Sequence, residues 1–111
     1  MRRGDIVLVV APGDHGKARP SVVVQSNRLA ESGGIIVCLV TGTIRDAPAF
    51  RITVEATSGT GLLQRSQIMV DKLLTVPRDK CGPRIGSIDR EALLALDQSL
   101  AFVLGLTDSA D

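Results

Sequence analysis

Two neighbouring stretches decide the fold: KARPSVVVQSN at Lys17–Asn27 and IIVCLVT at Ile35–Thr41. Each contains a short run of β-branched residues, which favours a strand, and the second run is apolar throughout, as in a strand buried on both faces. Arg19 lies at the entrance of the first strand and Thr41 at the end of the second. A guanidinium and a hydroxyl at the rim of a sheet suit an anionic group such as a phosphodiester.

Further strands are expected on both sides of these stretches. The loop of residues 11–18 contains two glycines and a proline, so it separates two strands rather than continuing one. A Ser-Gly-Thr-Gly turn follows the fourth strand, and Pro77 ends the last because proline cannot donate to a strand ladder. The expected strands are Ile6–Val10, Ser21–Gln25, Ile35–Thr41, Phe50–Glu55, Ser66–Val70 and Leu73–Val76.

The hydrophobic period changes to that of a helix after residue 87. Ser87 is a suitable N-cap, Asp89 and Glu91 favour a first turn, and leucines recur at helical spacing over 88–104 up to Gly105. Short strands followed by one terminal helix predict a mainly β fold. We expect a small SH3-like barrel with a C-terminal amphipathic helix, formed as one domain over residues 1–111.

Composition excludes several classes of function. The apolar runs are too short to cross a membrane, and no signal peptide is visible, so a cytoplasmic protein is expected. The single histidine and the absence of a CxxC spacing around Cys38 and Cys81 argue against a metal site, a disulfide framework or a metal cofactor. The chain is small enough to gain stability from a partner surface, which makes a homodimer plausible.

The charges are unevenly distributed although the formal net charge is only +1. Residues 1–87 carry twelve Lys and Arg against seven Asp and Glu, a net +5, whereas residues 88–111 carry one against five, a net −4. The basic part could bind a polyanion. With only two phenylalanines and no tyrosine or tryptophan, a base-stacking platform is nearly absent.

Four residues are candidates for chemistry. Pro20 holds Arg19 in an extended conformation, and the planar fork of arginine can bind two phosphate oxygens. Thr41 would present its hydroxyl at the sheet rim, Asp71 is a carboxylate between two apolar runs, and His15 can titrate near neutral pH. Each has an ordinary alternative, namely an exposed loop arginine, a strand cap, a structural ion pair and a solvated histidine.

These residues occur in an order that resembles the MazF/PemK (Kid) toxins of bacterial type II toxin–antitoxin systems. The similarity covers nearly the whole chain. It rests on Arg3-Gly4-Asp5-Ile6-Val7, on Arg19-Pro20 with Val22-Val23-Val24-Gln25, on the strand ending in Thr41, on Ser66 with Asp71 and Thr75, and on the leucine-rich terminal helix. The resemblance implies a ribosome-independent endoribonuclease that cuts single-stranded RNA, built as a homodimer of SH3-like barrels and inhibited by a small acidic antitoxin.

The resemblance also implies roles for individual residues. Arg19 and Thr41 match the catalytic arginine and threonine of the family, and Asp71 and, approximately, His15 match further catalytic positions. The chain departs from the family where a frequent Gln-Ile-Arg-Thr run reads Lys72-Leu73-Leu74-Thr75, and it lacks the common Glu-Gln-Gly lead before Arg19. RNA contacts are expected from Lys17, Asn27, Arg28, Arg45, Arg51 and Lys72.

The implied chemistry needs no metal or other cofactor. The ribose 2′-hydroxyl attacks the adjacent phosphorus and leaves a 2′,3′-cyclic phosphate and a 5′-hydroxyl. An arginine is a poor base, so Arg19 would stabilise the charge of the transition state. The main alternative is a CcdB-like toxin of the same barrel fold that binds DNA gyrase and leaves RNA intact. A catalytically inactive module of this fold is a third possibility.

Overall fold

The computed structural model describes residues 1–29 and 33–109. Within these residues the chain forms six strands, one short 3-10 helix and one α-helix. In chain order they are β1 (Asp5–Val10), β2 (Ala18–Val23), β3 (Gly34–Thr41), β4 (Arg51–Val54), β5 (Ser66–Pro77), η1 (Arg78–Lys80), β6 (Cys81–Ser87) and α1 (Arg90–Val103).

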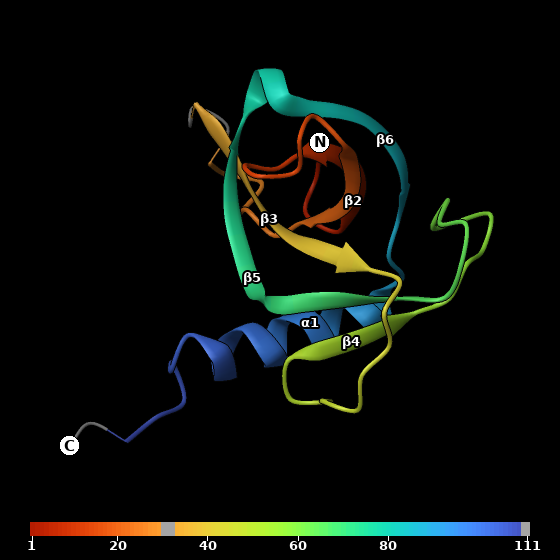
Figure 1. Ribbon diagram of the computed structural model, residues 1–111. Coiled ribbons are helices and arrows are strands. Elements are labelled where there is room, and N and C mark those ends of the chain that lie inside the picture. Colours follow the sequence, from red (N-terminus) through yellow and green to blue (C-terminus); the bar gives the residue numbers. More distant parts are fainter. Residues whose placement is uncertain (30–32, 110–111) are drawn as a thin grey trace.

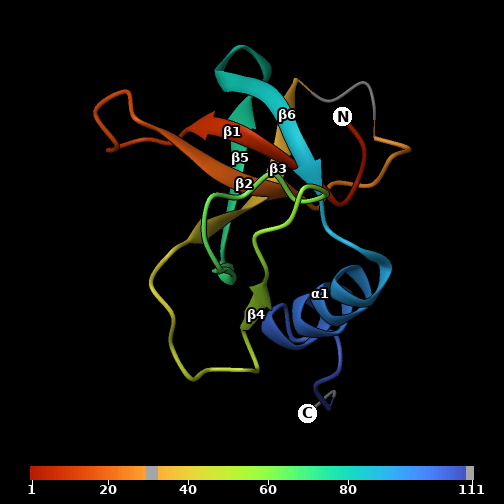
Figure 2. The same cartoon turned by 90° about the vertical axis from the view of Figure 1, so that its right-hand side faces the viewer.

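The strands form one strongly curved sheet with the order β4-β5-β3-β2-β1-β6, in which all neighbours are antiparallel. Figure 1 shows β5 and β6 wrapping around β1 and β2, while α1 lies behind β4 and below the adjoining half of β5. Figure 2 shows the helix standing clear of β1, β2 and β6. The expected mainly β fold with a C-terminal helix is confirmed.

Strand alternation divides the buried side chains into two clusters on opposite faces of the sheet. Ile6, Val22 and Cys38 point to the face that Leu96 of α1 covers. The sequence neighbours of these three residues point to the opposite face. They are Val7, Val23 and Val37, and they form a second cluster with Val76. The long strand β5 contributes side chains to both clusters, so it connects the cluster covered by α1 with the cluster on the opposite face.

The region expected to form two strands, Ser66–Val70 and Leu73–Val76, is one continuous strand, so that prediction is wrong. Asp71 and Lys72 suggested a break, but both side chains are exposed and do not interrupt the strand. The register between β3 and β5 shifts between Cys38 and Val40, so the strand accommodates extra residues by bending. Asp71 has no ion pair within the described residues, contrary to the structural ion pair considered for it.

Strand β6 is not among the strands expected from the sequence, because its segment contains Gly82, Pro83 and Gly86. It pairs with β1 at the edge of the sheet, with two register shifts. An edge strand tolerates proline because one side of it needs no ladder hydrogen bond. Arg84 secures this pairing, since its Nε donates to Oδ1 of Asp5 at 3.0 Å.

The helix begins later than expected. Asp89, not Ser87, is the N-cap, and its carboxylate accepts a hydrogen bond from the main-chain N–H of Ala92 at 2.8 Å. Ser87 is the last residue of β6, so it cannot also cap the helix. Gly105 follows the helix with φ of +73°, the left-handed conformation expected of a glycine that ends a helix.

Candidate functional site

Arg19 is the second residue of β2, where Pro20 favours the extended backbone that the strand requires. Its Nε lies 2.9 Å from Oδ2 of Asp14, in the loop between β1 and β2, although the N–H is not aligned well enough for a hydrogen bond. The Asp14 side chain is 18% exposed and that of Arg19 43% exposed. The arginine is therefore held through an ionic contact on one side while much of its side chain remains accessible.

The loop that carries Asp14 is built from tight turns. The N–H of Asp14 donates to the carbonyl of Ala11, and the N–H of Lys17 donates to the carbonyl of Asp14. His15 has φ of +52° and is exposed. These turns fix the Asp14 main chain, so its carboxylate reaches Arg19 from a defined position.

Thr41 ends β3, as expected. Its Oγ1 accepts a hydrogen bond of 3.1 Å from the main-chain N–H of Thr43, which leaves the hydroxyl proton available for another acceptor. Ser21 of β2 lies opposite Leu39 of β3, and continuing this register by two residues sets Arg19 opposite Thr41. The two strands therefore bring the two predicted residues to the same end of the sheet.

Both residues border one pocket of about 540 Å³. Its lining includes Leu8 of β1, the start of β2, the end of β3, and Gly61–Gln64, Ser66 and Ile85. Lys17 also borders it, so two cations and a hydroxyl adjoin the same space. The pocket can therefore accept an anionic group beside an apolar wall. No sequence pattern indicated Leu63, which borders the pocket although its side chain is fully exposed.

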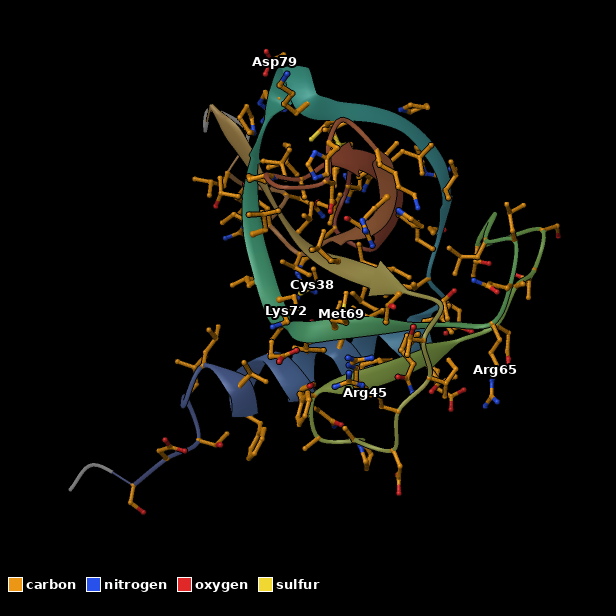
Figure 3. All side chains as sticks on the ribbon, viewed as in Figure 1. Cys38, Arg45, Arg65, Met69, Lys72 and Asp79 are labelled. Carbon is orange, nitrogen blue, oxygen red and sulfur yellow. The ribbon has the colours of Figure 1, made fainter. Side chains whose placement is uncertain are left out.

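The other predicted catalytic and RNA-binding residues lie outside this pocket. Asp71 and Lys72 are exposed on β5, and Figure 3 shows Lys72 close to the bend of that strand. His15 is not in the pocket lining, but it is next in sequence to Asp14. Arg28 is exposed, and the Oδ1 of Asn27 accepts a hydrogen bond from the N–H of Arg3 at 2.7 Å, beside a different, smaller pocket.

Arg45 and Arg51 belong to a hydrogen-bonded network around a residue that the sequence did not indicate. Gln67 is 3% exposed, and its side chain binds both main-chain groups of Arg45. Arg51 Nη1 donates to the same glutamine and to the carbonyl of Thr43. Arg51 is thus engaged within the protein, whereas the Arg45 side chain is exposed near β4 and the adjoining half of β5 (Figure 3).

Two further features bear on the class of site. Within residues 1–29 and 33–109, no three His, Cys, Asp or Glu side chains are grouped so that they could hold a metal ion. No helix of the described chain is long and apolar enough to cross a membrane.

Comparison with known proteins gives a consistent family. Residues 2–104 match the family model described as PemK-like, MazF-like toxin of type II toxin–antitoxin system. The chain is 37% identical over 107 residues to a probable endoribonuclease MazF of Mycolicibacterium smegmatis, covering 96% of this chain and 98% of that protein.

Solved structures share the fold. A mycobacterial endoribonuclease in complex with its cognate antitoxin has a TM-score of 0.78 at 21% identity, with 96% of each chain covered. The Mycobacterium tuberculosis toxin MazF-mt6 gives 0.78 at 22% identity over 91% of this chain and 96% of that chain. A MazE–MazF structure from Deinococcus radiodurans gives 0.75 at 19% identity over 95% of both chains.

Proposed function

This chain belongs to the PemK-like, MazF-like toxins of type II toxin–antitoxin systems, and from that premise we propose that it cuts single-stranded RNA at a specific sequence without a metal ion. Membership of a family of endoribonuclease toxins makes it an enzyme that acts on RNA. The observation that carries the finer proposal is the pocket that Arg19 and Thr41 both border. The RNA would be reached in the cytoplasm.

The reaction is a transesterification within the RNA. The 2′-oxygen forms a bond to the adjacent phosphorus, the bond from phosphorus to the 5′-oxygen breaks, and the products are a 2′,3′-cyclic phosphate and a 5′-hydroxyl. The 2′-hydroxyl loses a proton and the leaving oxygen gains one. DNA lacks the attacking hydroxyl and should be inert.

Arg19 stabilises the negative charge that develops on the phosphate. Its Asp14 contact is at Nε, so the terminal nitrogens are the ones that would meet two phosphate oxygens. Thr41 donates its hydroxyl proton to a nonbridging oxygen, since its oxygen already accepts from Thr43. Lys17, at the same pocket, binds the backbone of the RNA.

The proton transfers require another group. His15 is the better placed of the two expected carriers, because it adjoins Asp14 in the loop that leads to Arg19. Asp71 does not border the pocket of this chain. An imidazole commonly serves as a catalytic group that takes up a proton and then releases it.

Replacing either pocket residue tests the proposal. Arg19→Ala and Thr41→Ala should each lower the cleavage rate by about 100- to 1,000-fold, because each removes a group that stabilises the transition state. The measurement is cleavage of a mixed RNA with and without EDTA, with the new ends mapped and the folded state checked by urea unfolding.

The parent should cut RNA equally in EDTA and leave 5′-hydroxyl ends. Folded variants that cut at the parental rate would exclude these two residues from the site. A parent that leaves RNA intact but inhibits DNA gyrase would support the CcdB-like alternative instead.

We further propose that the active form is a homodimer and that a small acidic antitoxin with a disordered tail inhibits it. Phe102, Leu104 and Leu106 are exposed apolar side chains near the end of α1, as expected where a partner covers the surface. The basic character of residues 1–87 suits an acidic partner. One structural relative is described as an endoribonuclease in complex with its cognate antitoxin.

Native mass measurement checks both partners. The isolated protein should have twice the 11.7 kDa mass of one chain, and the antitoxin should raise that mass and stop RNA cleavage. A particle with the mass of one chain at the concentration of the cleavage assay contradicts the dimer. Undiminished cleavage in the presence of a bound acidic partner contradicts the inhibition.

A further inference from the structure

Gln67 uses the whole hydrogen-bonding capacity of its side chain on the chain segments that surround Thr41. Its Oε1 accepts from the N–H of Arg45 at 3.0 Å and from Nη1 of Arg51 at 3.3 Å. Its Nε2 donates to the carbonyl of Arg45 at 2.9 Å and to Oγ1 of Thr53 at 3.2 Å. A primary amide has two acceptor and two donor positions, so all four are occupied.

The geometry imitates strand pairing. A side-chain amide offers a donor and an acceptor side by side, as a peptide group does, and Gln67 pairs with the N–H and the C=O of the same residue, Arg45. Among the described residues none pairs with 42–46 in a strand ladder, and residues 42–46 are exposed. Gln67 therefore supplies to this segment the attachment that a neighbouring strand would otherwise give.

Gln67 is connected to Thr41 in two ways, through strand pairing and through a chain of hydrogen bonds. Gln67 lies directly opposite Thr41 in the pairing of β3 with β5. Arg51, bound to Gln67, also donates to the carbonyl of Thr43, whose N–H in turn donates to the Thr41 hydroxyl. Movement of the segment would thus change where the Thr41 hydroxyl points.

We propose that Gln67 is a positioning residue for RNA cleavage: it does not touch the RNA but fixes the segment 41–46, so that the Thr41 hydroxyl and the exposed Arg45 side chain keep one orientation toward the substrate. The inference rests on the proposed function, because it assigns Thr41 to the reaction. It goes beyond that function in giving a buried neutral side chain control over the rate and over the choice of cut site.

Three variants of nearly unchanged volume separate positioning from folding. Gln67→Met keeps the packing and removes all four hydrogen bonds, while the Arg45 carbonyl keeps its hydrogen bond from the N–H of Ala47. Gln67→Glu keeps the acceptor but places a carboxylate oxygen against the carbonyl of Arg45. Thr53→Val is the control, because it removes only one of the four bonds and leaves Arg45 attached.

The measurements are kcat and KM on a short RNA with one cut site, the ratio of cutting between that site and one with a single base changed, and hydrogen exchange of the Arg45 amide. Both Gln67 variants should lower kcat by about 10- to 100-fold with little change in KM, since small displacements of a reacting group cost rates of that order. The selectivity ratio should fall and the Arg45 amide should lose protection. Thr53→Val should stay within about two-fold of the parent in kcat, because the attachment of Arg45 remains.

Each result decides the proposal. Parental kcat and selectivity in Gln67→Met, together with a loss of Arg45 protection, would overturn it. If the loss of kcat is no larger than the loss of folded protein measured by urea unfolding, Gln67 has only a structural role, and the proposal is also overturned. The parent and Arg19→Ala are assayed in parallel, so an inactive parent identifies failure of the proposed function, whereas an active parent with an active Gln67→Met identifies failure of this inference alone.

Discussion

Asp14 influences the pocket through its contact with Arg19. A carboxylate beside the guanidinium weakens the attraction of that arginine for a phosphate, but it also restricts the rotation of a long, flexible side chain. Because the contact is made at Nε, we expect the terminal nitrogens of the guanidinium to bind the phosphate. We expect orientation to outweigh the partial loss of charge, since catalysis depends steeply on placement.

Replacing Asp14 with Asn should therefore lower kcat by about 10- to 100-fold while the protein stays folded. Asp14→Glu, which can restore the ionic contact, should recover part of the rate. The control is Asp79→Asn, because Asp79, on η1 at the end of the molecule opposite α1 (Figure 3), does not border the pocket of Arg19 and Thr41. A faster reaction in Asp14→Asn would mean that the carboxylate competes with the substrate instead.

Some members of this site could be found from the sequence and others could not. Arg19 and Thr41 stand next to Pro20 and Gly42, which mark the ends of two apolar strands, so local sequence predicts where they lie, whereas their catalytic roles are predictions that the family resemblance implies. Gln67 acts on Arg45, 22 residues away, and Arg51 acts on the same glutamine across the sheet. Such contacts depend on how the strands pair, and no local pattern records them.

At the scale of elements, the start of α1 depends on one carboxylate. Asp89→Ala should lower the free energy of unfolding by about 0.5–2 kcal/mol, because it leaves the N–H of Ala92 without its capping partner. Ser87→Ala is the matched control and should change stability by less, since Ser87 belongs to β6. The measurement is the urea midpoint of each variant, and a larger effect from Ser87 would place the cap where the sequence first suggested it.

The strands that the sequence missed share a physical cause. β6 has few β-branched residues, so its propensity is low, and it forms because the edge of β1 offers unpaired ladder groups. β5 passes through Asp71 and Lys72 without a break because both side chains reach solvent at its bend. In both cases the tertiary environment outweighs the local preference on which the sequence reading depended.

At the scale of the whole molecule, Cys38 reports on the integrity of both halves. Its side chain is fully buried in the cluster beneath α1, and its strand also contributes Ile35 and Val37 to the other cluster. Burial raises the pKa of the Cys38 thiol to about 12. The thiolate is the reactive form, so an alkylating reagent should modify Cys38 only when the sheet opens.

The raised pKa also predicts how stability varies with pH. The Cys38 thiol has a pKa of about 8.5 in the unfolded chain and of about 12 in the folded protein. Below about pH 8.5 the thiol is protonated in both states, so it does not lower the free energy of unfolding. As the pH rises from about 8.5 to about 12, only the unfolded chain loses the proton, and the free energy of unfolding falls. Cys38→Val should flatten this alkaline decline in urea midpoints. An equally steep decline in the variant would assign it to other groups.

The pairing of β1 with β6 brings together two segments that are far apart in the sequence, and the Arg84–Asp5 contact spans 79 residues. During synthesis, β1 leaves the ribosome long before its edge partner exists. Ile85 of that late strand also forms part of the wall beside Arg19 and Thr41. Loop closure over such a distance is slow compared with local folding, so the nascent chain acquires its complete pocket only after β6 has been translated.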